Sequence, residues 1–353
     1  MKEDEKLGIG IVGCGTISDV HAEAIQSLAD TRLVSVFDRE SGRAEHLGRK
    51  FGVSFHARWD SFIRESRLDA VSICTPSGTH LDYGKSAAAA GKHVIVEKPI
   101  EVTLDRGKAL MDACKACGVA LAVIFQNRFL DDAIRLRQLV QTGGLGKIFL
   151  ADAYIKWFRQ QSYYDSAAWR GTLALDGGGV LINQAIHTVD LLQWVAGRIR
   201  SVFGQTGTYT HDRIEGEDAA VAAVRFANGA IGVIEGSTSV KPAVDRRLEI
   251  HGESGTAVLE GNTLSVITGE SATAFPAGRG APKSGGASAP LQNFSTEPHR
   301  RQFQAIGQAI RAGTQPPVSG KEALDALAVV LAVYESARRQ APVDMDEWLR
   351  PYL

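Results

Sequence analysis

The sequence of 353 residues is poor in cysteine and carries no excess of either charge. Four cysteines do not make a disulfide framework in a chain of this length. The 39 Lys and Arg residues nearly balance the 40 Asp and Glu residues, which argues against nucleic acid or an anionic membrane as partner. No apolar run approaches the roughly 20 residues that cross a bilayer, and the charged first residues do not resemble a secretion signal. We therefore expect a cytoplasmic protein.

The cysteines also give no support for a metal or redox site. Cys114 and Cys117 form a C-x-x-C pair within a helical pattern, and no second pair follows at zinc spacing. Cys14 and Cys74 stand in loops where small size is reason enough for them. We interpret these residues as small packing residues and predict no metal.

The first part of the chain alternates strand and helix signals, and this alternation predicts βαβ crossovers and a parallel sheet. The chain is long enough for two domains, and 44% hydrophobic residues can bury a substantial core. Strands are predicted at 7–12, 33–37, 70–74, 93–96 and 120–125, and helices at 17–29, 41–51, 82–90 and 104–116.

Near residue 130 the pattern changes to segments with a period of two, joined by turns such as Asn228-Gly229. Such segments are typical of antiparallel strands. Strands are predicted at 147–157, 201–209, 219–226, 230–238, 247–251 and 256–260, helices at 132–142, 179–195, 299–312 and 321–339, and a long surface loop at 268–290. The predicted class is α/β: an N-terminal Rossmann domain with a doubly wound parallel sheet (1–127), and a C-terminal α/β domain with a large, open, mostly antiparallel sheet (128–353).

A dinucleotide site is predicted where the first strand meets the first helix. Gly13 and Gly15 allow a tight turn and the close approach of a pyrophosphate to the helix N-terminus. Asp38 ends the second strand about 20 residues later, where a carboxylate binds the ribose 2′-hydroxyl and repels a 2′-phosphate. NAD is therefore expected rather than NADP, although Arg39 and Arg43 could compensate for that repulsion.

Two further loops are candidates for the same site. Thr75 and Pro76 follow the fourth strand at the carboxyl edge of the sheet, where ligands bind, and His80 is expected to start the next helix. After the fifth strand comes the segment 97–99, Glu-Lys-Pro, in which the proline cannot continue a central strand. Lys98 is therefore expected at the carboxyl edge of the sheet, where its ammonium group can reach a bound ligand.

The second strong signal is a helix that begins with three glycines, 177–179, which predicts an N-terminus that a ligand can approach closely. Asn183 and His187 are four residues apart and share one helix face, with Asp190 three further on. A histidine in such an apolar helix is usually a core residue, so the interpretation of His187 as catalytic depends on Lys98 and the dinucleotide loop.

With these motifs in this order, and with 317–320 (Pro-Val-Ser-Gly) before a long helix, the chain resembles the Gfo/Idh/MocA oxidoreductase family over nearly its whole length. The resemblance implies a Rossmann domain and a C-terminal domain whose open sheet often mediates oligomerisation. It also implies that Lys98 and His187 lie beside the nicotinamide and the reacting carbon.

One departure from the family pattern affects the chemistry. Many members have an aspartate four residues before the histidine, and this chain has Asn183. An amide exchanges no proton, so Asn183 is expected to orient a sugar hydroxyl instead. Either His187 or a Lys98 of depressed pKa is the general base, and the sequence leaves both open.

The segment 156–165, followed by Trp169-Arg170, mixes aromatic and cationic residues, which suit pyranose rings and carboxylates or phosphates. With Asn183-Gln184 it looks similar to the subgroup that oxidises nucleotide-linked N-acetyl sugars or their uronates at C3. The predicted cofactor-binding residues are Gly13, Gly15, Thr16, Ile17, Asp38, Arg39, Thr75, Pro76, His80, Glu97, Lys98, Asn127, Trp169 and Arg170. The predicted substrate-binding residues are Lys98, Arg159, Tyr164, Asn183, Gln184 and His187.

The resulting hypothesis is an NAD-dependent dehydrogenase that moves a hydride from a ring carbinol of a sugar or nucleotide sugar to nicotinamide. Two alternatives from the same family stay open, an NAD-dependent glycosidase and a non-catalytic sugar-sensing regulator. The later strands lack enough helices to cover both faces of their sheet, which predicts a homodimer or homotetramer.

Overall fold

The computed structural model describes residues 6–269 and 295–352, which form two compact units. The first unit contains residues 6–129 and 295–324, and the second contains residues 130–269 and 325–352. The surface loop predicted at 268–290 lies almost entirely outside the described residues. Within the described ranges, every helix is too short or too polar to cross a membrane.

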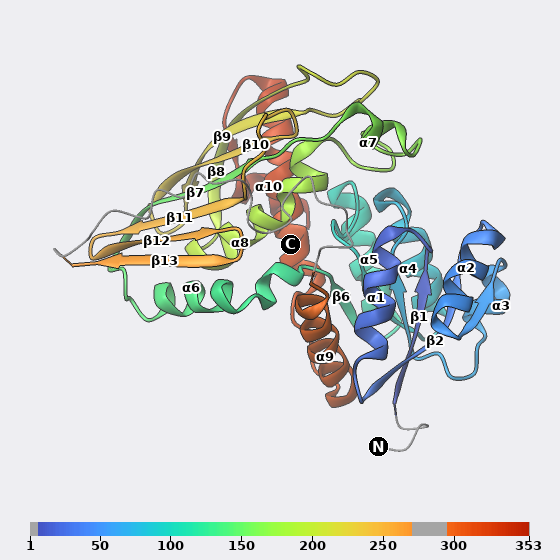
Figure 1. The fold of residues 1–353 in the computed structure, drawn as a ribbon. Helices are drawn as coiled ribbons and strands as arrows, with labels where there is room; N and C mark the ends of the chain where they lie inside the picture. Colours follow the sequence, from blue (N-terminus) through green and yellow to red (C-terminus); the bar gives the residue numbers. More distant parts are fainter. Residues whose placement is uncertain (1–5, 270–294, 353) are drawn as a thin grey trace. The chain divides into compact units, whose positions relative to one another are not determined.

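The first unit is built on a parallel sheet in the order β3-β2-β1-β4-β5-β6, with helices on its faces (Figure 1). The order reverses between β1 and β4, so their carboxyl ends form the switch point at which doubly wound sheets bind ligands. The strands are β1 (Leu7–Val12), β2 (Thr31–Phe37), β3 (Ser54–His56), β4 (Ala70–Ile73), β5 (His93–Val96) and β6 (Leu121–Val123). The helices are α1 (Thr16–Gln26), α2 (Ser41–Phe51), α3 (Trp59–Ile63), α4 (His80–Ala89) and α5 (Leu104–Ala116), with short 3₁₀ turns η2 (Ser77–Thr79) and η3 (Gln126–Phe129).

Helix α9 (Glu297–Ala312) belongs to the first unit, whereas the sequence placed it in a second domain spanning 128–353. It packs against α1 and η3, and its apolar residues Phe303 and Ile306 are fully buried in the same core as Ile25 of α1. The compact units therefore differ from the predicted domains in the place of α9. The apolar face of a helix predicts that the helix is buried on that side, but it does not specify which of two sheets the helix packs against.

The second unit is built on a sheet that has eight strands among the described residues, in the order β13-β12-β11-β7-β10-β9-β8-β14. All neighbours are antiparallel except β7 and β10, which are parallel. The strands are β7 (Ile148–Lys156), β8 (Ile199–Gly207), β9 (Ala219–Phe226), β10 (Ile231–Ser237), β11 (Arg247–Gly252), β12 (Gly255–Glu260), β13 (Thr263–Thr268) and β14 (Val343–Asp344). This confirms the predicted fold class.

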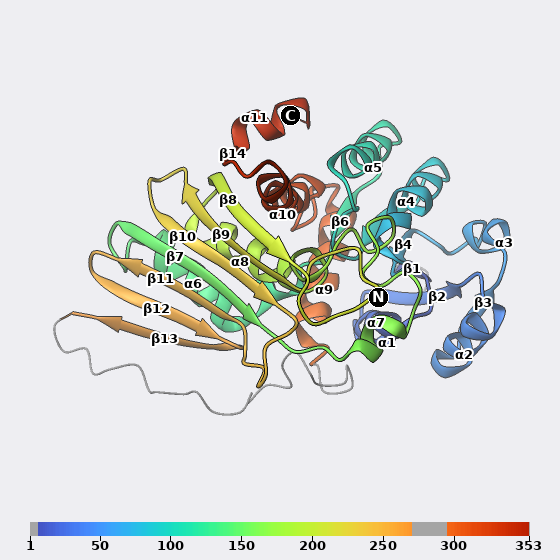
Figure 2. The ribbon, with the colours of Figure 1, turned by 90° about the horizontal axis from the view of Figure 1, so that it is seen from above.

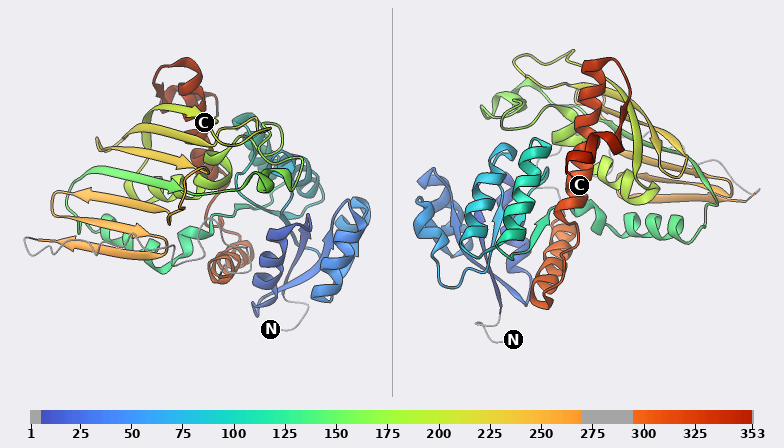
Figure 3. Two further views of the ribbon diagram at one scale, coloured as in Figure 1. Left: turned by 45° about the horizontal axis from the view of Figure 1, so that its top comes forward. Right: turned by 180° about the vertical axis from the view of Figure 1, so that it is seen from behind.

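Three helices of the second unit, α6, α8 and α10, lie on one face of this sheet (Figures 1 and 3). Helix α8 packs on β7, α6 packs on β12 and β13, and Val333 of α10 lies against Gly204 of β8. The helices of this unit are α6 (Asp131–Gln141), α7 (Gln161–Asp165), α8 (Ile186–Ala196), α10 (Gly320–Arg339, which begins in the first unit) and α11 (Met345–Leu349), with a 3₁₀ turn η6 (Arg350–Tyr352) at the end.

The opposite face of the sheet carries exposed apolar side chains, and the strands are seen fanned out in Figure 2. Phe203, Val221 and Ile231 lie on three neighbouring strands, and the strand register puts them on one face with Ala223 and Val233. Each of the three is 42–53% exposed. The alternation along β9 is complete, because every second residue points into the helix-covered core.

The fold makes a prediction about α9. Replacing Phe303 with alanine should lower the free energy of unfolding by about 3–5 kcal/mol, because a fully buried aromatic side chain is lost. The matched control is Gln308→Ala on the exposed side of the same helix, which should change stability little. Chemical denaturation of both variants measures this, and equal stability of the two would contradict the assignment of α9 to the core.

Candidate functional site

The glycine loop between β1 and α1 leaves the start of the helix open. Gly13 has a φ of 90°, and a Cβ there would lie 2.8 Å from the Thr75 methyl carbon, so this position needs glycine. A Cβ on Gly15, by contrast, would meet no protein atom within 4 Å. Gly15 is also the N-cap of α1, and no side chain caps it. The first N–H groups of α1, which include those of Thr16 and Ile17, therefore suit the pyrophosphate of a dinucleotide.

The carboxylate of Asp38 is held beside this loop. Its Oδ2 accepts the Cys14 N–H at 2.8 Å, and its Oδ1 accepts the Glu40 N–H at 2.8 Å. Arg39 is exposed, and Arg43 pairs with Glu40 on the surface at 2.9 Å. Asp38 thus stands where the sequence predicted it, fixed by two backbone donors, whereas Arg43 already has an acidic partner.

His80 turns out to join two loops rather than face outward. Its side chain is buried, with Nδ1 2.9 Å from the Pro99 carbonyl oxygen and Nε2 3.0 Å from the Thr75 carbonyl oxygen. Burial lowers its pKa. The imidazole therefore has no surface left for a cofactor, which corrects that prediction. Thr75 and Pro76 are half-buried at the end of β4 and stay candidates.

Glu97 is also turned inward, and it holds the backbone of Lys98. One carboxylate oxygen lies 3.0 Å from Nε2 of the fully buried His21, and the other accepts the Lys98 N–H at 3.1 Å. Burial raises the pKa of Glu97, but the hydrogen bond and charge of His21 outweigh it and bring the pKa to about 2. An ionised Glu97 thus anchors the residue before the cis Lys98–Pro99 bond, and Lys98 itself is half-buried.

His299 of α9 completes this buried cluster. The ring centroids of His21 and His299 are 5.6 Å apart. One atom each of His21, Glu97 and His299 lies within 4.8 Å of the others. The ion pair of His21 and Glu97 explains their approach without a metal. Asn127, in η3 after β6, is buried, and its neighbour Arg128 bonds Glu322 at 2.5 Å.

In the second unit, the glycine-led helix is closed by the protein itself. Glu217 accepts the Gly179 N–H at 3.0 Å and the Leu181 N–H at 2.8 Å. This corrects the expectation that the three glycines admit a ligand. The helix begins with a π-helical turn, Leu181–Ala185, which continues into α8. His187 lies in the first turn of α8 and is half-buried, while Asp190 is buried.

Asn183 and Gln184 lie on the π turn and take part in one polar network. The Asn183 amide oxygen accepts bonds from the Tyr163 hydroxyl at 3.2 Å and from Gln184 at 2.5 Å, and its nitrogen donates to Asp176. Asp176 is buried and also accepts the Gly171 N–H at 2.8 Å. Asn183 is thus oriented by its neighbours, and the Asp176 carboxylate accepts a hydrogen bond from its amide nitrogen.

Arg159 and Arg170 lie against the ring of Tyr163. Their guanidinium carbons are 5.1 Å and 4.2 Å from its centroid, and Arg170 also lies 4.7 Å from the centroid of Trp169. Arg159 donates to the Gln184 amide oxygen at 3.1 Å. Within residues 6–269 and 295–352, neither arginine has an ion-pair partner. Each has a buried Nε without an acceptor.

Tyr164 differs from its prediction as a substrate residue, because its side chain is buried. The hydroxyl bonds Thr238 at 3.0 Å, and the ring packs edge-on against His211 at 4.7 Å. Tyr163, which the sequence analysis did not select, takes the position in the network instead. Because the two tyrosines are adjacent in a short segment without a clear hydrophobic period, the sequence does not indicate which of them is buried.

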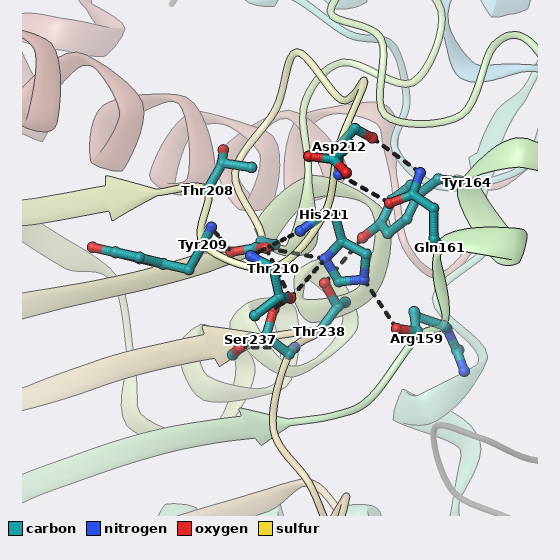
Figure 4. A network of polar contacts seen from close by, with 12 residues as sticks. Arg159, Gln161, Tyr164, Thr208, Tyr209, Thr210, His211, Asp212, Ser237 and Thr238 are labelled. Carbon is teal, nitrogen blue, oxygen red and sulfur yellow. Dashed lines mark hydrogen bonds and ion pairs between the residues drawn. The ribbon is translucent and has the colours of Figure 1, made fainter.

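A loop from Thr208 to Asp218 fixes the Arg159 segment (Figure 4). His211 lies between the Asp218 carboxylate, 3.0 Å from Nδ1, and the Arg159 carbonyl oxygen, 2.9 Å from Nε2. The side chain of Gln161 bonds both the N–H and the carbonyl of Asp212. Asp176, Asp218 and Glu217 were all missed as site residues. They carry no sequence motif, and their roles depend on contacts across the fold.

Comparison with known proteins agrees with this description. Residues 7–125 match the oxidoreductase family with an NAD-binding Rossmann fold, and residues 133–258 match the GFO/IDH/MocA C-terminal domain. The chain is 30% identical to D-glucoside 3-dehydrogenase of Escherichia coli (64% of this chain, 68% of the relative) and 26% identical to inositol 2-dehydrogenase of Rhizobium meliloti (95% and 98%). The structure of the WlbA dehydrogenase from Bordetella pertussis, in complex with NADH and UDP-GlcNAcA, is similar with a TM-score of 0.84, at 31% identity and covering 96% of this chain and 98% of that one.

The chain belongs to the Gfo/Idh/MocA oxidoreductase family. The predictions of an NAD-binding Rossmann domain and of an NAD-dependent dehydrogenase acting on CH–OH groups are confirmed. The individual site residues stay predictions, with the corrections given above for the side chain of His80 and for Tyr164.

The geometry of Asp38 predicts the effect of removing its carboxylate. Asp38→Ala should weaken NAD binding and improve NADP binding, because the repulsion of a 2′-phosphate is lost. The loss of the bond to the Cys14 N–H should limit the gain. Calorimetric titration with both cofactors measures this, with Glu40→Ala as the neighbouring control. Tighter binding of NADP than of NAD by the unaltered protein would contradict this reading of Asp38.

Proposed function

We propose that this NAD-dependent dehydrogenase oxidises a ring carbinol of an anionic sugar, a uronate or a nucleotide sugar. The observation that carries the proposal is the pair Arg159 and Arg170, which both lie against the ring of the half-buried Tyr163. The proposal assigns Arg170, which the sequence analysis lists with the cofactor residues, to the substrate. An aromatic ring suits the apolar face of a pyranose, and a guanidinium binds a carboxylate or phosphate with two parallel hydrogen bonds.

The electrostatics of Arg159 favour an anion over a neutral hydroxyl. Burial lowers its pKa, since the charged form loses water, and Arg170 opposes its charge further. A half-buried cation without an acidic partner is costly, and a bound carboxylate or phosphate would relieve that cost. The similar WlbA structure at 31% identity contains UDP-GlcNAcA, which carries both groups, and this supports the proposal.

A neutral sugar or polyol is the second candidate, because inositol 2-dehydrogenase and D-glucoside 3-dehydrogenase are among the relatives. The deciding experiment follows reduction of NAD at its absorbance with UDP-GlcNAcA, a free hexuronate, myo-inositol and a glucoside. Oxidation of only the neutral compounds would overturn the proposal. Cleavage of a chromogenic glycoside without net reduction would instead favour the glycosidase alternative.

Arg170→Met should raise KM for an acidic substrate by roughly 10–100-fold, because one charge-assisted contact is worth about 1.5–3 kcal/mol. It should leave KM for any neutral substrate nearly unchanged. The control is Arg213→Met, since Arg213 is exposed and pairs with Asp165 at 2.9 Å. Steady-state kinetics on both variants measures this. An equal change for acidic and neutral substrates would show that Arg170 only supports the fold.

Lys98 and His187 keep, within this proposal, the roles that the family resemblance implies. The Gly13/Gly15 loop and Asp38 would hold NAD, which would supply the hydride acceptor when bound. One of the two residues takes the hydroxyl proton, and the other stabilises the charge left on oxygen.

Lys98→Met and His187→Asn should each lower kcat by about 10²–10⁴-fold and leave NAD binding nearly intact. If His187 is the base, His187→Asn also removes the limb of the pH profile near neutrality, whereas Lys98→Met keeps it. The reverse pattern assigns the proton to Lys98. If neither variant slows oxidation tenfold, the proposed catalytic roles are wrong.

The proposal includes a homodimer or homotetramer formed through the open face of the eight-stranded sheet. Phe203, Val221 and Ile231 make that face apolar and exposed, as oligomer contacts usually are in the separated subunit. A cytoplasmic location stays a prediction of the sequence.

Val221→Glu should shift the assembly toward monomers, because it places a charge in the middle of the apolar face. Phe55→Glu is the matched control, since Phe55 is 44% exposed on β3 of the first unit. Light scattering at micromolar concentration measures the mass of both variants. A monomeric unaltered protein would contradict the assembly.

A further inference from the structure

Glu217 is a buried acid at the start of the glycine-led helix. Its two carboxylate oxygens accept the Gly179 and Leu181 N–H groups, and one of them also accepts the Tyr334 hydroxyl at 3.0 Å. Its own carbonyl oxygen accepts the Val180 N–H at 2.9 Å. One residue thus binds three consecutive N–H groups of a helix start, and a tyrosine of α10 fixes its carboxylate from the other side.

Two of the three glycines, Gly178 and Gly179, make room for this residue and for its neighbours. A Cβ on Gly179 would overlap the Glu217 carbonyl oxygen, and a Cβ on Gly216 would overlap the backbone of Gly178. A Cβ on Gly178 would lie 2.6 Å from the Tyr334 hydroxyl oxygen. Gly178 and Gly179 are therefore the packing surface for Gly216, Glu217 and Tyr334, and this close fit holds the helix start against them.

The helix that begins here carries the substrate-side residues. The Asn183 N–H bonds the Gly179 carbonyl at 3.1 Å, so the first turn leads directly into the π turn with Asn183 and Gln184. His187 follows one turn later on α8. A π turn inside a helix is often found at functional sites, because it changes the direction of the residues after it. The helix start therefore fixes where these side chains lie.

We propose that Glu217 is a positioning residue for the dehydrogenase reaction: by capping the glycine-led helix, it sets the placement of Asn183, Gln184 and His187. The carboxylate occupies the place that an anionic ligand takes at an open helix N-terminus. The kinetic test of this inference rests on the proposed function. The hydrogen-exchange test below does not depend on that function.

Burial raises the pKa of Glu217 to about 7, although the backbone N–H groups and Tyr334 oppose the shift. Tyr334 is the titratable group that faces it, and burial keeps that hydroxyl protonated by raising its own pKa. Because the folded state holds this proton more tightly than the unfolded state, the contribution of Glu217 to stability falls as pH rises toward 7. Glu217→Gln should lack that dependence.

The first test compares Glu217→Gln with Glu215→Gln, a control in the same loop whose carboxylate is exposed. A glutamine offers one acceptor oxygen and turns an NH₂ group toward a helix N–H. We expect hydrogen exchange of the peptide 179–188 to quicken at least tenfold in Glu217→Gln alone. Exchange equal to that of Glu215→Gln would overturn the proposal without bearing on the substrate.

The second test is kinetic, at 25 °C and with UDP-GlcNAcA as the probe, or with the neutral compound that the unaltered enzyme oxidises. Glu217→Gln should lower kcat at least tenfold while the NAD dissociation constant stays within twofold. A purely structural role would lower the melting temperature and leave kcat unchanged, and that result would overturn the positioning role.

Tyr334→Phe keeps the proposal testable if Glu217→Gln does not fold. It removes only one of the three donors to the same carboxylate. It should raise exchange of the 179–188 peptide and lower kcat in the same direction, by a smaller factor. Unaltered exchange and kcat in Tyr334→Phe would overturn the proposal.

Discussion

Unpaired N–H groups at the start of a helix are the constraint on which this structure depends most. They carry partial positive charge and must find an acceptor. Two helices in the described part of the chain begin directly after glycines, and their first N–H groups are treated in opposite ways. The start of α1 has no side-chain cap, whereas the glycine-led helix of the second unit is capped by Glu217. The first suits a cofactor, and the second fixes the chain's own side chains.

In each unit, buried acidic residues hold the candidate site residues of that unit in place. In the first unit, Glu97 ties the backbone of Lys98 to the buried His21. In the second unit, Asp176 fixes Asn183, and Asp218 fixes the Arg159 segment through His211. Such buried carboxylates orient the candidate site residues in advance, which limits the freedom those side chains would lose on binding a ligand.

Much of the fold could be predicted from the sequence because period and turn chemistry are local. The bounds of α2, α5, β5 and β9 match their predictions residue for residue. The short elements β3, α3 and α7 were missed, since three to five residues show no clear period. The place of α9 was missed for another reason, because an amphipathic helix does not specify which core receives its apolar face.

The sequence by itself determined the family, the cofactor and the sheet that binds it. These can be read from the sequence because they depend on particular residue types at fixed spacing. The residues are a glycine loop after a strand, an acid about 20 residues later and a lysine at a strand end. Only the tertiary structure decided which glycine loop leaves its helix start open and which one is filled by the protein. Glu217 lies 38 residues from Gly179, and no local pattern connects them. Tyr163 and Tyr164 were likewise separated only by the surroundings that the folded chain gives to each.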